Sequence, residues 1–149
     1  MSGVHERPVG ATVEWYTPAK VLTRLGRFDL DPACGDPRRC HVRASEHWAT
    51  EGDTLPWYGR IWLNPPYGPA GVRFIDRMIA HDHGLMLLPA RTETRAFQRA
   101  IKAADAVCFL RDRLWFERND GFVGRSSFGS VLFSFGPYDA DLTHLGWTV

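Results

Sequence analysis

Short apolar runs alternate with helix-like periodicities along most of this chain. Turn-forming residues bound each apolar run, which is typical of buried strands. Strands are predicted at Phe28–Asp31, within His41–Trp48, and at Ile61–Leu63, Gly84–Leu88, Ala106–Leu110 and, as the last, Ser130–Phe135. Strands that alternate with helices indicate an α/β domain built on a mostly parallel sheet with helices on both faces.

Three helices are predicted from capping residues and apolar spacing. The first has Thr17 as its N-cap and Pro18 as its first helical residue, and it ends at Gly26. The second follows a proline-rich turn and reaches about residue 82, with apolar positions at Val72, Ile75, Met78 and Ile79. The third begins at Thr94, with Phe97 and Ile101 facing inward.

Length and composition set broad bounds on the class of protein. The 149 residues suit one domain, with residues 1–13 as a flexible lead-in and residues 14–149 as the folded part. A net charge of +1 means that any nucleic-acid surface must be local. No apolar run has transmembrane length and residues 1–13 lack a signal-peptide core, so we expect a cytoplasmic protein without membrane contact.

The three cysteines add no chemistry at this stage. Cys34, Cys40 and Cys108 have neither the spacing of metal ligands nor an even number. They are expected to be reduced thiols, and no metal is expected.

One stretch organises the rest of the chain, Asn64-Pro65-Pro66-Tyr67. Proline fixes φ and restricts the residue before it, so the segment is stiff. The two prolines lack N–H groups, so the backbone offers acceptors without competing donors. The Asn64 side-chain oxygen and the Pro65 carbonyl can converge on an amine, and Tyr67 offers a face for the ring that carries it. The bland alternative is a strand followed by a proline turn with a buried tyrosine.

Two turns are candidates for holding a small ligand beside this stretch. The strand ending at Asp31 runs into the small-residue turn Pro32-Ala33-Cys34-Gly35. Ligands bind at the carboxyl ends of parallel strands, and Asp31 can pair with an ammonium group. In the second turn, 51–55, Asp53 can accept a hydrogen bond from an adenine amino group. Chain reversal alone also explains each turn.

Basic and aromatic side chains are interleaved between residues 91 and 125. The segment holds eight basic and five acidic residues. This mixture suits phosphate neutralisation and stacking of a displaced base. The predicted nucleic-acid contacts are Arg91, Arg95, Arg113, Trp115, Phe116, Arg118 and Arg125. For any single residue, a solvated face or a core position is an equally good explanation.

Taken in order, these segments resemble those of S-adenosylmethionine-dependent amino-methyltransferases that act on N6 of adenine in DNA. The likeness is greatest to the small phage-encoded, Dam-like enzymes, through Glu14-Trp15-Tyr16-Thr17-Pro18, Phe28-Asp29-Leu30-Asp31-Pro32 and Trp62-Leu63-Asn64-Pro65-Pro66-Tyr67-Gly68. It covers roughly residues 14–136. It implies a minimal, Rossmann-like class I methyltransferase domain without a separate target-recognition domain.

The resemblance also implies S-adenosylmethionine as cofactor, DNA as substrate and a role for each matching residue. The implied cofactor contacts are Trp15, Thr17, Pro18, Asp31, Pro32, Ala33, Asp53 and Thr54. The implied catalytic residues are Asn64, Pro65, Pro66 and Tyr67, with Phe116 or Trp115 as a second stacking aromatic.

Several alternatives stay open from the sequence. The segment between the two turns is short for a full helix and strand, which leaves the ribose contact to a guess, Glu46. RNA adenine and a protein glutamine amide offer the same two-donor geometry as DNA adenine. A catalytically silent nucleic-acid-binding module is the alternative from another class. Both a monomer and a homodimer are compatible with the sequence.

Overall fold

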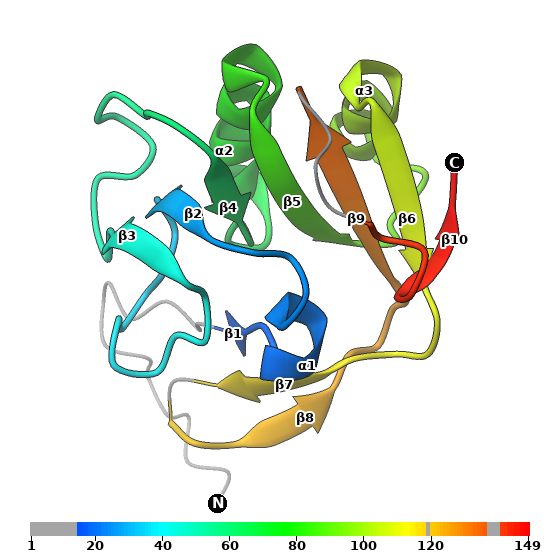
Figure 1. Cartoon of the computed structure of the whole chain (residues 1–149), viewed down its shortest axis with the longest axis horizontal. Coiled ribbons are helices and arrows are strands. Elements are labelled where there is room, and N and C mark those ends of the chain that lie inside the picture. The colour runs from blue at the N-terminus through cyan, green and yellow to red at the C-terminus, as the bar shows by residue number, and fades with distance from the viewer. Residues whose placement is uncertain (1–14, 119, 137–140) are drawn as a thin grey trace, which may run out of the picture.

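A seven-stranded mixed sheet forms the centre of the molecule (Figure 1). The structure, a computed structural model, describes residues 15–118, 120–136 and 141–149, so the expected lead-in 1–13 lies outside the described residues. The strand order is β10-β6-β9-β5-β4-β2-β3. The strands are β2 (Phe28–Asp31), β3 (Ala44–His47), β4 (Ile61–Leu63), β5 (Gly84–Pro89), β6 (Ala106–Leu110), β9 (Ser130–Phe135) and β10 (Gly146–Thr148).

Strand directions differ from the mostly parallel sheet that the sequence predicts. The pairs β3–β2, β2–β4 and β4–β5 are parallel, whereas β5–β9, β9–β6 and β6–β10 are antiparallel. The reason lies in the connections, since among the described residues no helix lies between β6 and β9 or between β9 and β10. A parallel neighbour needs a long crossover, and without one the chain returns in the opposite direction. The fold is therefore mixed α/β.

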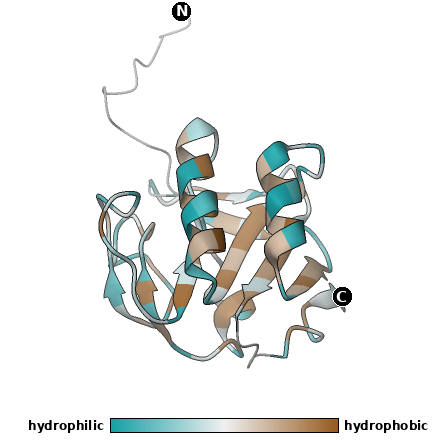
Figure 2. Cartoon of the chain, turned by 90° about the horizontal axis from the view of Figure 1, so that it is seen from above, coloured by the Kyte–Doolittle hydropathy of each residue, from teal (hydrophilic) through white to brown (hydrophobic). Residues whose placement is uncertain are grey.

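Two helices cover one face of this sheet, α2 (Pro69–His81) and α3 (Arg95–Ala103). Figure 2 shows them side by side, with hydrophilic residues turned away from the strands. The opposite face is covered by the four-residue helix α1 (Ala19–Leu22) and by a second, three-stranded sheet. The prediction of helices on both faces is not confirmed, since this face is covered by the small sheet and only a four-residue helix.

The small sheet has the order β1-β7-β8, with all its pairs antiparallel. It joins β1 (Trp15–Tyr16), near the start of the described chain, to the hairpin of β7 (Trp115–Arg118) and β8 (Val123–Arg125). Figure 1 shows it lying below the end of the large sheet at which β4 finishes. The chain leaves β4 there and enters Asn64.

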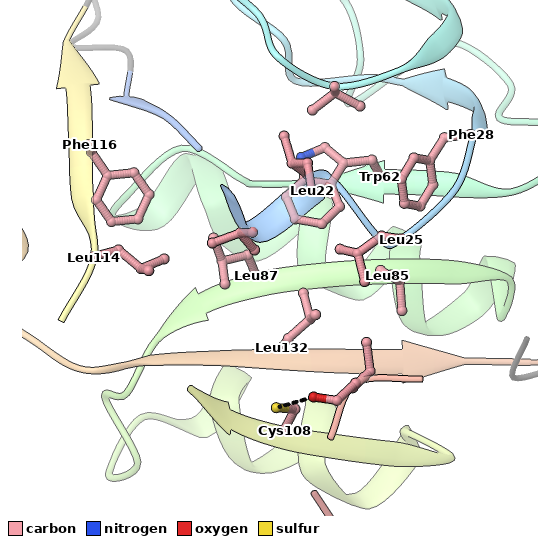
Figure 3. Close-up of a cluster of buried hydrophobic side chains, with 13 residues drawn as sticks. Leu22, Leu25, Phe28, Trp62, Leu85, Leu87, Cys108, Leu114, Phe116 and Leu132 are labelled. Carbon is pink, nitrogen blue, oxygen red and sulfur yellow. Dashed lines mark hydrogen bonds between the residues drawn. The ribbon is translucent and has the colours of Figure 1, made fainter. Parts of the chain in front are cut away.

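Two apolar clusters, one on each face, hold the layers together. Alternate residues of the central strands point to opposite faces, so Leu85 and Leu87 enter one cluster and Met86 and Leu88 the other. Figure 3 shows the cluster under the small sheet, to which Phe116 of β7 and Leu87 of β5 both contribute. The central strands are apolar over their whole length because both of their faces are covered.

Two predicted helix features are wrong in detail. Thr17 does not cap the first helix, because α1 begins at Ala19 with Pro18 in the N-cap position and no side-chain cap. Ile101 does not face inward, since 41% of it is exposed. Thr94 is confirmed as the cap of α3, because its hydroxyl oxygen accepts a hydrogen bond from the Phe97 N–H.

Candidate active site

Asn64 stands immediately after β4, with its amide nitrogen held from one side. Its Nδ2 donates to the backbone carbonyl of Trp15 at 3.1 Å and lies 3.4 Å from the hydroxyl oxygen of Thr17. A carbonyl oxygen only accepts hydrogen bonds, so the Asn64 amide must turn its nitrogen toward Trp15. The Asn64 side-chain oxygen is thereby left to serve as an acceptor elsewhere.

The prolines that follow form a bend braced by α2. Gly71, in the first turn of α2, approaches the Pro66 carbonyl so closely that a Cβ atom there would lie 1.9 Å from its oxygen. Gly68 precedes α2 with φ of 82°, a conformation that glycine adopts without strain. Tyr67, between these features, has 52% of its surface exposed. The ring is thus presented outward, contrary to the alternative of a buried tyrosine.

A narrow cavity of about 200 Å³ lies on one side of the bend. The turn after β2 supplies Pro32, Ala33, Cys34 and Gly35, and the turn after β3 supplies Ala49, Thr50, Glu51 and Gly52. These turns touch, since a Cβ at Gly52 would lie 1.7 Å from the Pro32 carbonyl oxygen. Trp15, Asn64 and Phe74 complete the wall. The predicted cofactor residues Trp15, Pro32 and Ala33 therefore line one cavity together with the Asn64 segment.

Three other predicted cofactor residues lie outside this cavity. Asp31 is buried, and its carboxylate faces Cys40 Sγ at 3.3 Å and His47 Nδ1 at 3.5 Å rather than the cavity. Thr17 is buried behind Asn64, and Pro18 is the N-cap of α1. Thr17 acts on the site indirectly, through the Asn64 amide nitrogen.

The second turn also differs from the prediction. Asp53 pairs with Arg73 at 3.6 Å, and the Thr54 hydroxyl donates to the Glu51 carbonyl, so neither side chain lines a cavity. Glu51 lines the cavity instead, with a φ of 60° that is uncommon for a residue with a side chain. The sequence did not indicate that Glu51 lines the cavity, because its left-handed backbone conformation depends on how the turn packs in the folded chain.

Glu46, the guess for the ribose contact, is occupied elsewhere. The Tyr58 hydroxyl and the Trp48 indole N–H both bond to its carboxylate, which lowers the pKa of Glu46 and raises the pKa of Tyr58 to about 12. Glu46 lines neither cavity.

A wider cavity of about 600 Å³ lies on the other side of the bend. Its volume is within the range of roughly 300–1,000 Å³ that is typical of small-molecule sites. The two cavities share Trp15, Pro65, Pro66 and Tyr67, so the bend forms the wall between them. Val72 also lines the wider one, which explains why this apolar helix position is 38% exposed.

Among the predicted nucleic-acid residues, Arg91, Phe116 and Arg125 line the wider cavity. Phe116 is 4% exposed and Trp115 is 53% exposed and outside the cavity, because successive residues of β7 point to opposite faces. Of the two competing stacking aromatics, Phe116 is therefore the one beside the bend. The aromatic Phe128, which the sequence did not single out, also lines the cavity, and the Arg91 guanidinium lies 5.1 Å above its ring.

The remaining predicted contacts lie outside the cavity. Arg118 is paired with Asp120, and its guanidinium lies 4.8 Å above the Phe122 ring. Arg95 and Arg113 are exposed.

The narrow and the wide cavity thus lie on either side of one bend, whose residues Pro65, Pro66 and Tyr67 line both, together with Trp15. A family model described as "DNA N-6-adenine-methyltransferase (Dam)" matches residues 7–148. The chain belongs to this family, whose activity is the methylation of adenine N6 in DNA. No curated protein and no solved structure matches the chain.

Across residues 15–118, 120–136 and 141–149, none of the helices combines the length and apolarity needed to cross a bilayer.

Proposed function

We propose that this chain transfers a methyl group from S-adenosylmethionine to the N6 amine of adenine in DNA. The observation that carries the proposal is the position of the Asn64-Pro65 bend: Pro65 lines both cavities, and Asn64 lines the narrow cavity directly beside it. A methyl donor on one side and a target base on the other would meet there.

The chemistry required at this wall is activation of a weak nucleophile. The N6 lone pair is delocalised into the adenine ring. Acceptance of its two hydrogens by the Asn64 side-chain oxygen and the Pro65 carbonyl favours a pyramidal nitrogen and stabilises the positive charge that develops on it. The stabilisation is electrostatic and greatest in the transition state. The bonds from Asn64 Nδ2 to Trp15 and Thr17 support it, because they fix the amide before substrate arrives.

The narrow cavity suits the charge of the proposed cofactor and can hold part of it, since about 200 Å³ is below the roughly 300–1,000 Å³ that is typical of small-molecule sites. S-adenosylmethionine carries two cationic groups, a ribose and a flat purine. The Glu51 carboxylate can accept hydrogen bonds from hydroxyl or ammonium groups, and the rings of Trp15 and Phe74 offer apolar faces. Ala33 and Gly35 keep side-chain bulk away from the backbone, which permits close approach.

When bound, the cofactor supplies a methyl group already activated as a sulfonium. What the chain adds is placement of the amine, for which the stiff Pro65-Pro66 bend and its brace at Gly71 are suited.

The wide cavity suits a base taken out of the DNA duplex. Tyr67 and Phe116 offer stacking faces, and Arg91 and Arg125 offer positive charge for the phosphates. Withdrawal of the base from a duplex costs a few kcal/mol, which a stacking contact of about 1–3 kcal/mol per base offsets in part.

The test is a transfer assay with purified chain, methyl-labelled S-adenosylmethionine and DNA, followed by nucleoside analysis. We expect N6-methyladenine, with an Asn64→Ala variant slower by about 10²–10³-fold, the loss typical of one deleted stabilising group. Gln98→Ala is the matched control, because it deletes an exposed amide on α3 outside both cavities. Label found only on cytosine or only on protein would refute the proposal.

Competition between substrates separates the alternatives. An excess of unlabelled RNA or glutamine peptide should leave the rate on DNA unchanged. A silent binding module would hold DNA equally well with or without Asn64 and form no product with any acceptor.

A further inference from the structure

Folding gathers four metal-binding side chains that are scattered along the sequence. Asp31 ends β2, Cys34 lies in the turn that follows, Cys40 lies in the next loop and His47 ends β3. One ligand atom from each lies within 4.8 Å of all the others. The spacing of these four residues along the sequence is irregular and matches no metal-binding motif. The parallel pairing of β2 with β3 brings Asp31 opposite His47.

The separations suit a tetrahedral ion. Asp31 Oδ2 lies 3.3 Å from Cys40 Sγ and 3.5 Å from His47 Nδ1. A tetrahedron with zinc–oxygen, zinc–nitrogen and zinc–sulfur bonds of normal length has edges of about 3.3–3.8 Å. These two separations already match such an edge, and the other pairs lie within 4.8 Å, so they need to close by at most about 1 Å to surround one ion.

The polar atoms at the centre show the same preference. His47 Nδ1 is buried, and the Asp31 carboxylate faces it at 3.5 Å, the outer limit of a hydrogen bond; the described residues offer it no hydrogen bond of good geometry. A buried polar atom with such a long contact is poorly satisfied, and a metal bound to both groups would satisfy it. The other Asp31 oxygen, Oδ1, accepts from the Ala33 N–H at 3.4 Å, the kind of support that orients a metal-bound carboxylate.

The backbone around the cluster is already fixed. The Trp48 N–H donates to the Asp31 carbonyl at 2.9 Å, and the Cys34 N–H donates to the Trp48 carbonyl at 3.1 Å. By contrast, residues 32–43, all of them described, form turns and loops without a helix or strand. A cross-link between the ends of β2 and β3 would hold this loop where regular structure does not.

We propose that Asp31, Cys34, Cys40 and His47 form a structural zinc site. Two thiolates and an imidazole favour zinc over magnesium or calcium, which prefer oxygen ligands. Four protein ligands fill a tetrahedral shell, so the ion holds structure and leaves no open position for substrate. It would fix Cys34 and its neighbours Ala33 and Gly35, which line the narrow cavity. The site therefore stabilises the cavity wall without taking part in methyl transfer.

The experiment measures metal rather than activity. The full chain is purified under reducing conditions without chelators, and its zinc content is determined by elemental mass spectrometry. We expect close to one zinc per chain, falling at least tenfold in Cys34→Ser and in Cys40→Ser. Cys108→Ala is the matched control, since Cys108 is buried in the opposite half of the sheet and lies outside the cluster. It should keep its zinc.

A second measurement avoids dependence on variants that fold poorly. Cobalt added to the metal-free wild-type chain should give the visible bands of a tetrahedral ion and a thiolate-to-cobalt charge-transfer band, and zinc should displace both. A chain that purifies without metal and gives an octahedral cobalt spectrum would overturn the proposal. So would a Cys34–Cys40 disulfide in the reduced preparation, or an unchanged zinc content in both serine variants.

Discussion

The substitution Gly71→Ala tests whether α2 sets the position of the catalytic bend. In the first turn of a helix, alanine is ordinarily favoured over glycine, by up to about 1 kcal/mol. Here the added Cβ would lie 1.9 Å from the Pro66 carbonyl oxygen, whereas real Cβ atoms essentially never come closer than 3.0 Å. The bend or the helix must therefore move by about 1.1 Å. Helix propensity and collision thus predict opposite signs of the stability change.

We expect the collision to dominate. Forced overpacking typically costs about 1–3 kcal/mol of unfolding free energy, and a misplacement of roughly 1 Å at a reacting centre can slow a reaction about a hundredfold. Thermal denaturation and kcat/KM for DNA methylation, measured on the same preparation, check both effects.

Gly129→Ala is the control for this comparison. Its Cβ would meet only Ala90 at an ordinary 3.9 Å, so stability should change by less than about 0.5 kcal/mol. If Gly71→Ala were more stable than the parent and equally active, the reasoning about the Pro66 contact would be refuted.

Three further substitutions test single contacts. Thr17→Val should lower kcat by about two- to tenfold in the transfer assay, because one contact that orients the Asn64 amide is lost. Thr17→Ser keeps the hydroxyl and should keep the rate. Equal rates for Thr17→Val and the parent chain would contradict a positioning role for Thr17. Phe116→Leu should raise KM for DNA and also lower the unfolding free energy by about 1 kcal/mol, because the side chain is 4% exposed and packs in the core. Trp115→Leu should raise KM less, since only Phe116 lines the wide cavity; the reverse order would assign the stacking to Trp115. Arg125→Gln should reduce the slope of log binding constant against log salt by about one in a fluorescence titration with DNA. The control Arg99→Gln breaks an ion pair with α2 outside both cavities and should leave the slope unchanged. Equal slopes for both variants would remove Arg125 from the phosphate contacts.

Much of the fold could be predicted because local signals and burial agree. β2, β4, β6 and β9 have the predicted bounds, because each is a short run with buried apolar residues between turn-forming segments. The strand directions could not be predicted in the same way. They depend on whether a crossover helix precedes a strand, and the chain before β9 forms a hairpin instead.

The site shows the same division between local and long-range information. The Asn64–Tyr67 bend could be predicted because proline stiffness and side-chain chemistry act locally. The contacts of Thr17 and Asp31 could not be predicted, because their partners are distant in sequence. Thr17 contacts Asn64, and Asp31 contacts Cys40 and His47. Position within a recognised segment therefore did not reveal which way these side chains face.

The two-residue strand β1 links parts of the molecule that otherwise have separate tasks. Trp15 pairs with Arg118 of the hairpin and, through its carbonyl, restrains the Asn64 amide. Its neighbour Tyr16 accepts a hydrogen bond from the Asp36 N–H, in the loop behind the narrow cavity. β1 therefore joins the hairpin, the Asn64 amide and the loop behind the narrow cavity. Under the proposed function, a movement of the hairpin on DNA contact would reach the sites of both substrates through this one short strand.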